Sequence, residues 1–191
     1  MLTQEEATEI FKKANALLTG HFKLTSGRHS NQYMQCAQVL QYPHYAAKLC
    51  ADLAERFAGK KVDVVIGPAM GGIIVAYEVA RALGVRAIFT EREQGVMTLR
   101  RGFSIGKDEK VLVVEDVITT GGSVKEVIEV VKATGAEIVG VGVLVDRSNG
   151  RVEFGLPAEA VLRLDIKSYQ PEECPLCKEG LPLVKPGSRN I

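Results

Sequence analysis

The sequence has few cysteines and almost no net charge. Four cysteines among 191 residues, Cys36, Cys50, Cys174 and Cys177, are too few for a disulfide scaffold. The formal net charge is +1 at pH 7, so the chain lacks the general electrostatic attraction that draws basic proteins to nucleic acid. A small anionic substrate would therefore have to be held by local groups.

Long apolar runs and a leader-like segment are also missing. No apolar run approaches the roughly 20 residues that a bilayer-spanning helix needs. Residues 1–9 contain three glutamates and no basic stretch followed by an apolar one, so we expect no signal peptide and, by default, a cytoplasmic protein. The length and the 46% hydrophobic content suit one compact globular domain, residues 1–191.

Short apolar runs rich in valine and isoleucine alternate with helical segments in the middle of the chain. The runs are residues 62–66, 85–89, 111–114 and 137–145. This pattern predicts an α/β fold, a doubly wound parallel sheet covered by helices on both faces. We expect further short strands at 152–154 and 160–164.

The N-terminal third has a different pattern. Thr3 and Glu6 have the spacing of a capping box, and the apolar spacing that follows predicts a helix that runs through Leu17 and Leu18 to Gly20. Residues 21–35 are polar and favour an extended or hairpin segment. The predicted divisions of the single domain are an N-terminal helix and strand hood with helices (1–60), an α/β core (61–168) and an irregular tail (169–191).

Ligands of such a sheet bind beyond the carboxyl ends of its strands, where the loops 67–72, 90–102 and 115–122 begin. The most informative segment is V-L-V-V-E-D-V-I-T-T-G-G-S, residues 111–123. It delivers two acids at the end of a buried strand and then opens a helix with glycines and hydroxyl side chains. A helix N-terminus of this kind binds phosphate through free N–H groups and its partial positive charge. The alternative is an ordinary strand-to-helix turn with a threonine or serine cap. The dinucleotide fingerprint G-x-G-x-x-G and the P-loop pattern are both absent here.

This segment closely resembles the phosphoribosyl pyrophosphate signature of type I phosphoribosyltransferases, and D-V-I-T-T-G-G-S is most similar to that of the orotate enzymes. Further segments resemble that family in the expected order: H-F-K-L-T-S-G-R-H-S (21–30), G-P-A-M-G-G-I (67–73) and V-D-R (145–147). The segment E-R-E-x-G-V-M and the C-P-L-C tail are similar to a short, thermophile-type branch.

The resemblance implies the fold of the type I family and a pentosyltransferase activity in pyrimidine (UMP) biosynthesis. The phosphoribosyl group of phosphoribosyl pyrophosphate would pass to orotate, giving orotidine 5′-phosphate and pyrophosphate. It also implies Mg²⁺ held mainly through the substrate, and a homodimer that shares a lid between its subunits. Two alternatives remain open: a phosphoribosyltransferase for another base, and a regulatory protein that binds phosphoribosyl pyrophosphate.

The resemblance also assigns site residues. Those implied to bind phosphoribosyl pyrophosphate are Ala69, Met70, Gly71, Gly72, Glu115, Asp116, Val117, Ile118, Thr119, Thr120, Gly121, Gly122 and Ser123. Those implied to bind orotate are Ser26, Thr119 and Arg147, and those implied to act in catalysis are Asp116, Arg92, Arg100 and Arg101.

Simple chemistry bears on several of these assignments. A guanidinium such as that of Arg147 binds a carboxylate with two parallel hydrogen bonds, although it could equally be a surface group paired with Asp146. Residues 67–72 offer successive backbone N–H groups that suit a pyrophosphate, or simply form a tight turn. The segment 90–102 is either the mobile lid of the family or a solvated charged hairpin.

The chain departs from the better-known branch of the family at two positions. Thr25 and Gly71 stand where those enzymes have lysines, and the lid lacks their K-x-H pattern. Arginines could supply the missing positive charge, and the sequence does not assign which: Arg28, Arg92, Arg100 and Arg101.

The tail contains C-P-L-C, and Cys174 and Cys177 make half of a zinc site. Cys36, Cys50, histidines or a second subunit could complete it. The favoured interpretation is a pair of structural thiols in an ordered tail. A redox role is disfavoured, since the motif does not open a helix after a strand.

Overall fold

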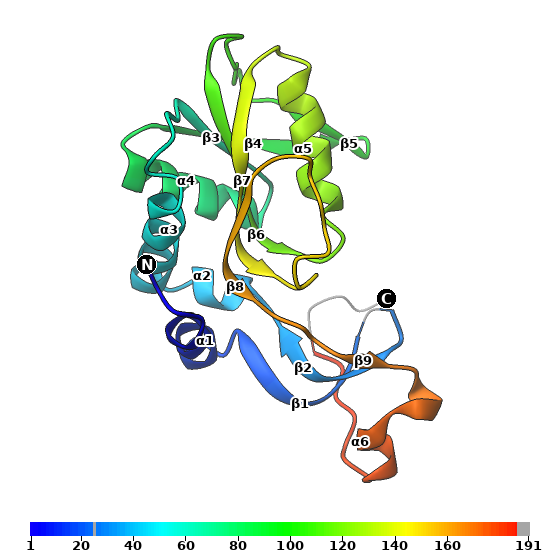
Figure 1. The fold of residues 1–191 in the computed structure, drawn as a ribbon. Coiled ribbons are helices and arrows are strands. Elements are labelled where there is room, and N and C mark those ends of the chain that lie inside the picture. The colour runs from blue at the N-terminus through cyan, green and yellow to red at the C-terminus, as the bar shows by residue number, and fades with distance from the viewer. Residues whose placement is uncertain (25, 187–191) are drawn as a thin grey trace.

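The computed structural model describes residues 1–24 and 26–186, and within them the chain forms two sheets (Figure 1). The larger sheet has the strand order β5-β4-β3-β6-β7-β8. Its strands are β3 (Val64–Pro68), β4 (Arg86–Glu93), β5 (Val96–Leu99), β6 (Lys110–Ile118), β7 (Glu137–Asp146) and β8 (Ala158–Arg163). All adjacent pairs are parallel except β4 and β5, which form an antiparallel hairpin. The predicted doubly wound parallel sheet is confirmed.

Helices cover both faces of this sheet (Figure 1). α3 (Pro43–Glu55) and α4 (Gly71–Leu83) lie on one face, and α5 (Gly122–Lys132) lies on the other. The strands are buried on both sides, so β3 points Val65 into the core under α3 and α4, and Val64 and Ile66 into the core under α5. This two-sided burial is why these strands are continuous apolar runs.

The chain reverses direction across the sheet between β3 and β6. From β3 it winds outward to β4 on one side, and from β6 it winds outward through β7 and β8 on the other. The loops that leave β3 and β6 therefore diverge to opposite faces and leave a crevice between them, which is the position where open α/β sheets bind ligands.

The smaller sheet belongs to the N-terminal hood and has the order β1-β2-β9. The hood elements are α1 (Gln4–Lys13), β1 (Leu17–Lys23), β2 (His29–Met34), the short α2 (Ala37–Leu40) and β9 (Ser168–Tyr169). The predicted hairpin within 21–35 is present. The prediction that the first helix continues to Gly20 is wrong. Asn15 has a left-handed φ of 52° that ends the helical path, and Leu17 instead begins β1 opposite Met34.

Two further differences concern the end of the chain. Residues 152–154 form no strand, contrary to expectation, and instead pack beside the start of α5. In the described part of the tail, the 3₁₀ helix η1 (Pro171–Glu173) and α6 (Pro175–Lys178) follow β9. Val184 then exchanges backbone hydrogen bonds with β1, accepting from Lys23 N–H and donating to the His21 carbonyl. The tail is thus fastened to the hood (Figure 1). Among the described residues, no helix is both long and apolar enough to span a bilayer.

Candidate functional site

The loop between β6 and α5 forms one wall of a pocket of about 240 Å³ at the crevice. Its lining includes Glu115, residues 117–124, Arg92 and Glu126. The N-cap of α5 is Gly121, so this position has no side chain to cap the helix. The first N–H groups of an α-helix have no partner within the helix, and the dipole makes this end partly positive. The pocket therefore has the properties of an anion site.

Gly121 is required here by local geometry. Its φ of +72° lies in the left-handed region, where a side chain is strained. A Cβ at this position would also come within 2.7 Å of Val152 and 2.9 Å of Phe154. The 152–154 segment thus packs against the back of this turn.

Two adjacent carboxylates, Glu115 and Asp116, lie at the end of β6. The Asp116 N–H donates to Glu115 Oε1 at 3.0 Å, and the Val117 N–H donates to Asp116 Oδ1 at 2.8 Å. Burial raises the pKa of Glu115 well above its ordinary value, and the neighbouring charge of Asp116 raises it further. Burial also raises the pKa of Asp116. The pair therefore tends to retain a proton, and an arriving cation or hydrogen-bond donor would favour the release of that proton to solvent.

The glycine loop that begins α4 lies directly against these acids. A Cβ at Gly71 would overlap the Asp116 carboxylate, and a Cβ at Gly72 would lie 3.2 Å from Glu115 Oε1. The N-terminus of α4 has no side-chain cap either. Ala69 N–H donates to the Thr90 carbonyl at 2.7 Å, and Met70 is 82% exposed. Glu115 and Asp116 therefore lie between two helix N-termini, one from each side of the crevice.

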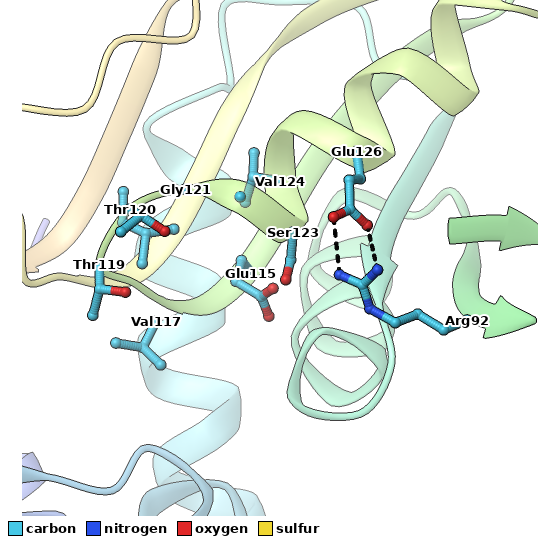
Figure 2. A pocket seen from close by; sticks show the side chains of 11 residues that line it. Arg92, Glu115, Val117, Thr119, Thr120, Gly121, Ser123, Val124 and Glu126 are labelled. Carbon is cyan, nitrogen blue, oxygen red and sulfur yellow. Dashed lines mark hydrogen bonds and ion pairs between the residues drawn. The ribbon is translucent and has the colours of Figure 1, made fainter. Parts of the chain in front are cut away.

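Figure 2 shows how the side chains around the α5 turn are arranged. The Glu115 carboxylate lies next to the hydroxyl of Ser123, while Thr119 and Thr120 lie on the far side of the turn. Arg92 extends from β4 and forms an ion pair with Glu126 of α5 at 2.8 Å. Arg92 thus borders the pocket from within its own chain, with its charge partly neutralised.

Arg147 follows β7 and is tied to the β6 loop by its N–H, which donates to the Ile118 carbonyl at 2.9 Å. Its Nε is buried and has no hydrogen-bond partner, and burial lowers the pKa of the guanidinium. The ion pair with Asp146 considered from the sequence is not formed. Asp146 instead accepts hydrogen bonds from Ser148 and from the Gly150 N–H. A buried guanidinium nitrogen without a partner is costly unless a ligand supplies one.

The other lid arginines are held inside the β4–β5 hairpin. Arg101 forms an ion pair with Glu91 at 3.0 Å, and Arg100 lies 3.4 Å from Glu91 and 3.3 Å from Glu93. Residues 90–102 are thus largely a charged hairpin with its basic groups paired, and Arg100 and Arg101, unlike Arg92, lie outside the lining of the 240 Å³ pocket. Within this chain, Arg100 and Arg101 are paired with the hairpin glutamates and not with Glu115 or Asp116.

The hood contributes an exposed turn. Ser26 is exposed in the turn between β1 and β2. Arg28 donates to the hydroxyl of Ser168 at 2.8 Å and to its carbonyl at 2.6 Å, so it links the turn between β1 and β2 to β9. Thr25 lies outside the described residues.

The tail cysteines meet two histidines that the sequence prediction did not name. Cys174 and Cys177 lie with His21 and His29 in one cluster, whereas Cys36 and Cys50 are buried elsewhere. A signal was present in the sequence. Two of the three histidines flank the turn of the predicted hairpin, where short antiparallel strands bring them together.

Comparison with known proteins decides the family. A family model described as "Phosphoribosyl transferase domain" matches residues 37–154, which run from the start of α2 to the end of the 152–154 segment. The chain belongs to this family. A curated orotate phosphoribosyltransferase of Pelotomaculum thermopropionicum is 65% identical over 190 residues, with all of both chains covered. One from Caldanaerobacter subterraneus subsp. tengcongensis is 60% identical over the same length and coverage. Within the family, the chain is thus a member of the orotate phosphoribosyltransferases.

Solved structures agree with this assignment. The orotate phosphoribosyltransferase of Aeropyrum pernix has a TM-score of 0.68 at 29% identity, covering 82% of this chain and 92% of its own. That of Mycobacterium tuberculosis, solved with Fe(III) dicitrate, has a TM-score of 0.68 at 27% identity, covering 83% of this chain and 96% of its own. The family, fold and activity implied by the motifs are confirmed.

Proposed function

We propose that the crevice between the β3 and β6 loops carries out phosphoribosyl transfer from phosphoribosyl pyrophosphate to orotate. The activity is that of the family, and the roles that we give to individual residues are our proposal. The β6–α5 loop carries it: Arg147, whose Nε is buried and unpaired, bonds through its N–H to Ile118 at the start of this loop, and the uncapped N-terminus of α5 lies at its end. The guanidinium of Arg147 suits a carboxylate, which orotate supplies. The N-terminus of α5 suits a phosphate, which phosphoribosyl pyrophosphate supplies.

Each part of the substrates has a matching part of the crevice. The N–H groups of the α5 turn and the hydroxyls of Thr119, Thr120 and Ser123 would hold the 5′-phosphate. Glu115 and Asp116 would accept hydrogen bonds from the ribose hydroxyls. The N–H groups at the start of α4 would meet the pyrophosphate.

The base would be positioned by Arg147, with Thr119 and the hood residue Ser26 closing around it. N1 of orotate would displace pyrophosphate from C1 of the ribose through a transition state with oxocarbenium character. Negative charge then builds on the leaving pyrophosphate, where the α4 N-terminus can stabilise it. We expect no protein nucleophile, because the incoming base is itself the nucleophile.

The two acids also suit Mg²⁺, which prefers few carboxylates together with substrate oxygens and water. They are adjacent, Glu115 is buried and Asp116 half-buried, and a bound cation would favour the ionised forms that their raised pKa values disfavour in the free protein. When bound with the substrate, Mg²⁺ would supply further neutralisation of the leaving group.

We further propose a cytoplasmic homodimer in which the β4–β5 hairpin serves the neighbouring active site. Within its own chain, the hairpin keeps Arg100 and Arg101 in ion pairs away from the acids. A partner's pyrophosphate could compete for these exposed guanidiniums, because ion pairs at the surface are weak.

A base panel tests the function. Purified protein is incubated with phosphoribosyl pyrophosphate, Mg²⁺ and either orotate, uracil, adenine or hypoxanthine, and pyrophosphate release is followed. We expect release with orotate far above the others. Turnover of a purine or uracil instead would favour an enzyme for another base. Binding of phosphoribosyl pyrophosphate without turnover of any base would favour the regulatory alternative.

A further inference from the structure

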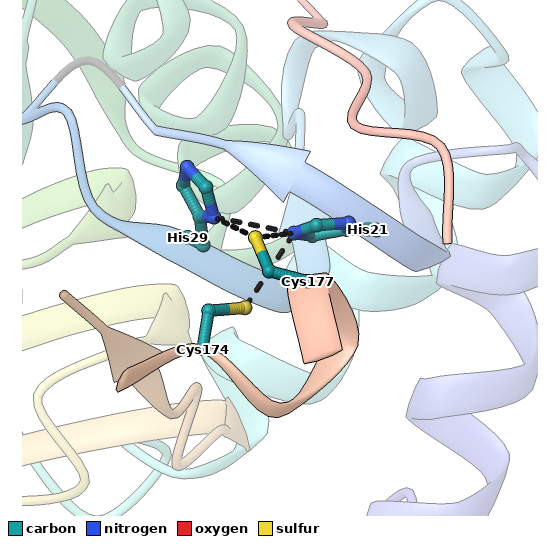
Figure 3. A group of neighbouring side chains, drawn as sticks. All are labelled: His21, His29, Cys174 and Cys177. Carbon is teal, nitrogen blue, oxygen red and sulfur yellow. Dashed lines mark hydrogen bonds between the residues drawn. The ribbon is translucent and has the colours of Figure 1, made fainter. Parts of the chain in front are cut away.

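Four side chains outside the crevice form a compact cluster of metal-binding atoms (Figure 3). His21 comes from β1, His29 from β2, and Cys174 and Cys177 from the start and body of the α6 turn. One donor atom from each lies within 4.8 Å of all the others. Figure 3 shows the two imidazoles and the two sulfurs pointing toward a common centre.

The spacing between these atoms matches a tetrahedral site. His21 Nε2 lies 3.2 Å from His29 Nδ1, and it lies 3.5 Å and 3.7 Å from the sulfurs of Cys174 and Cys177. The Cys177 sulfur lies 3.2 Å from His29 Nδ1. Zinc bonds of about 2.3 Å to sulfur and 2.0–2.1 Å to nitrogen imply tetrahedral edges of roughly 3.3 to 3.8 Å. The separations of 3.5 and 3.7 Å fall within this range, and the two of 3.2 Å lie just below it.

The surroundings of the cluster favour a bound ion over a chance grouping. His21, His29 and Cys174 are buried, with exposed fractions of 4%, 5% and 0%. Burying several polar groups that must share few protons is unfavourable unless a common partner satisfies them. The other ring nitrogen of His21, Nδ1, lies 2.8 Å from the Leu181 carbonyl. A proton on Nδ1 leaves Nε2 free as a ligand, which is the outer hydrogen bond typical of metal-bound histidine.

We propose that His21, His29, Cys174 and Cys177 bind one structural zinc ion that fastens the C-terminal tail to the hood. Two thiolates and two imidazoles in a tetrahedron are a ligand set that zinc favours. No ligand position is left open, so the site is structural and not catalytic. The ion joins segments about 150 residues apart in sequence, where β9 and the backbone bonds of Val184 provide the other links.

Metal content tests this proposal independently of enzyme activity. Protein purified without chelator should contain about one zinc per chain by elemental analysis. Cys177→Ala and His29→Asn should lose that zinc. The matched controls are Cys50→Ala, a buried cysteine of α3, and His44→Asn, an exposed histidine of the same helix. Both controls should retain it.

A second measurement uses the wild-type chain, so it does not depend on whether the variants fold. A strong zinc chelator should lower Tm, and added zinc should restore it. Cobalt added to the chelated protein should give the absorption of a tetrahedral site with thiolate ligands. Three outcomes would each overturn the proposal: wild-type protein that neither contains nor takes up zinc, variants that keep zinc at the control level, or a disulfide joining Cys174 and Cys177 in the purified protein.

Discussion

The α-carbon of Gly71 faces the carboxylate of Asp116 so closely that a methyl group on it would overlap the carboxylate. This contact bears on the lysine that the better-known branch of the family has at this position. A lysine at residue 71 could enter this structure only if Asp116 moved. The glycine therefore keeps the start of α4 and the acid of β6 in contact, and the two must be considered one unit.

Gly71→Ala should lower kcat/KM for phosphoribosyl pyrophosphate while the chain remains folded. The added methyl group would push the Asp116 carboxylate aside, and a misplacement of about 1 Å can cost about 10²-fold in rate. Gly59→Ala is the matched control, because a Cβ at Gly59 meets nothing within 4 Å. Steady-state kinetics and Tm of both variants are compared. Equal kcat/KM in the two variants would show that the contact between Gly71 and Asp116 does not position the substrate.

The raised pKa values of Glu115 and Asp116 predict proton release on substrate binding. The free site retains a proton at a pH where isolated carboxyls would be ionised. Phosphoribosyl pyrophosphate with Mg²⁺ favours the ionised pair, so its affinity should rise as the pH rises toward the raised pKa. Isothermal titration in two buffers with different heats of ionisation measures the protons released. Proton uptake, or no exchange at all, would contradict this assignment.

The same pair should affect folding stability with the opposite dependence on pH. A carboxyl whose pKa is raised in the folded protein favours folding below its unfolded pKa, and this contribution is lost as the pH rises toward the folded pKa. Glu115→Gln removes the ionisation. The variant should therefore gain Tm relative to the wild type as the pH is raised from 4 to 8. A difference in Tm that stays constant over this range would rule out a raised pKa for Glu115.

Arg147→Ala should remove activity without loss of stability. The Arg147 Nε is buried without a partner, so its truncation removes an unfavourable group as well as packing. We expect Tm to be unchanged or slightly raised while orotate turnover falls, and binding of phosphoribosyl pyrophosphate to be nearly unaffected. A large fall in Tm would mean that Arg147 is mainly a structural residue.

Much of this arrangement follows from local sequence, and the parts that do not share a physical cause. The sequence predicts the strands 111–114 and 137–145 and the turn that opens α5, because continuous apolar runs and glycine-rich turns are local signals. The end of the first helix was missed, because a single left-handed residue, Asn15, overrides the helical spacing of Leu17.

Contacts between segments far apart in the chain could not be predicted from such local patterns. The pairing of Arg100 and Arg101 with glutamates of the hairpin depends on strand register. The meeting of Cys177 with His29 depends on where a tail some 150 residues away docks. Residue types suggest such chemistry, but only the packed chain brings the partners together.

Complementation between two inactive variants tests the shared lid. Arg101→Ala lacks the guanidinium proposed to act in the lid, and Asp116→Asn lacks the carboxylate proposed to bind the ribose. If the lid acts strictly in trans, random exchange of subunits pairs an intact lid with an intact ribose loop at roughly a quarter of the sites. Activity should return to about that fraction after mixing. Failure to regain activity, with exchange confirmed by mass, would mean that the hairpin serves its own chain. If light scattering shows that the protein is monomeric and an assay shows that it is fully active, a shared site is excluded.

The ratio of kcat/KM for orotate to that for uracil tests the central claim most directly. A site built around a half-buried guanidinium with an unpaired Nε should discriminate against the analogue that lacks the carboxylate, by roughly 10²-fold or more in the wild-type enzyme. In Arg147→Ala the ratio should fall toward one, chiefly through the loss of orotate turnover. Equal values for the two bases in the wild type, or a ratio unchanged by Arg147→Ala, would contradict the proposal that Arg147 selects orotate.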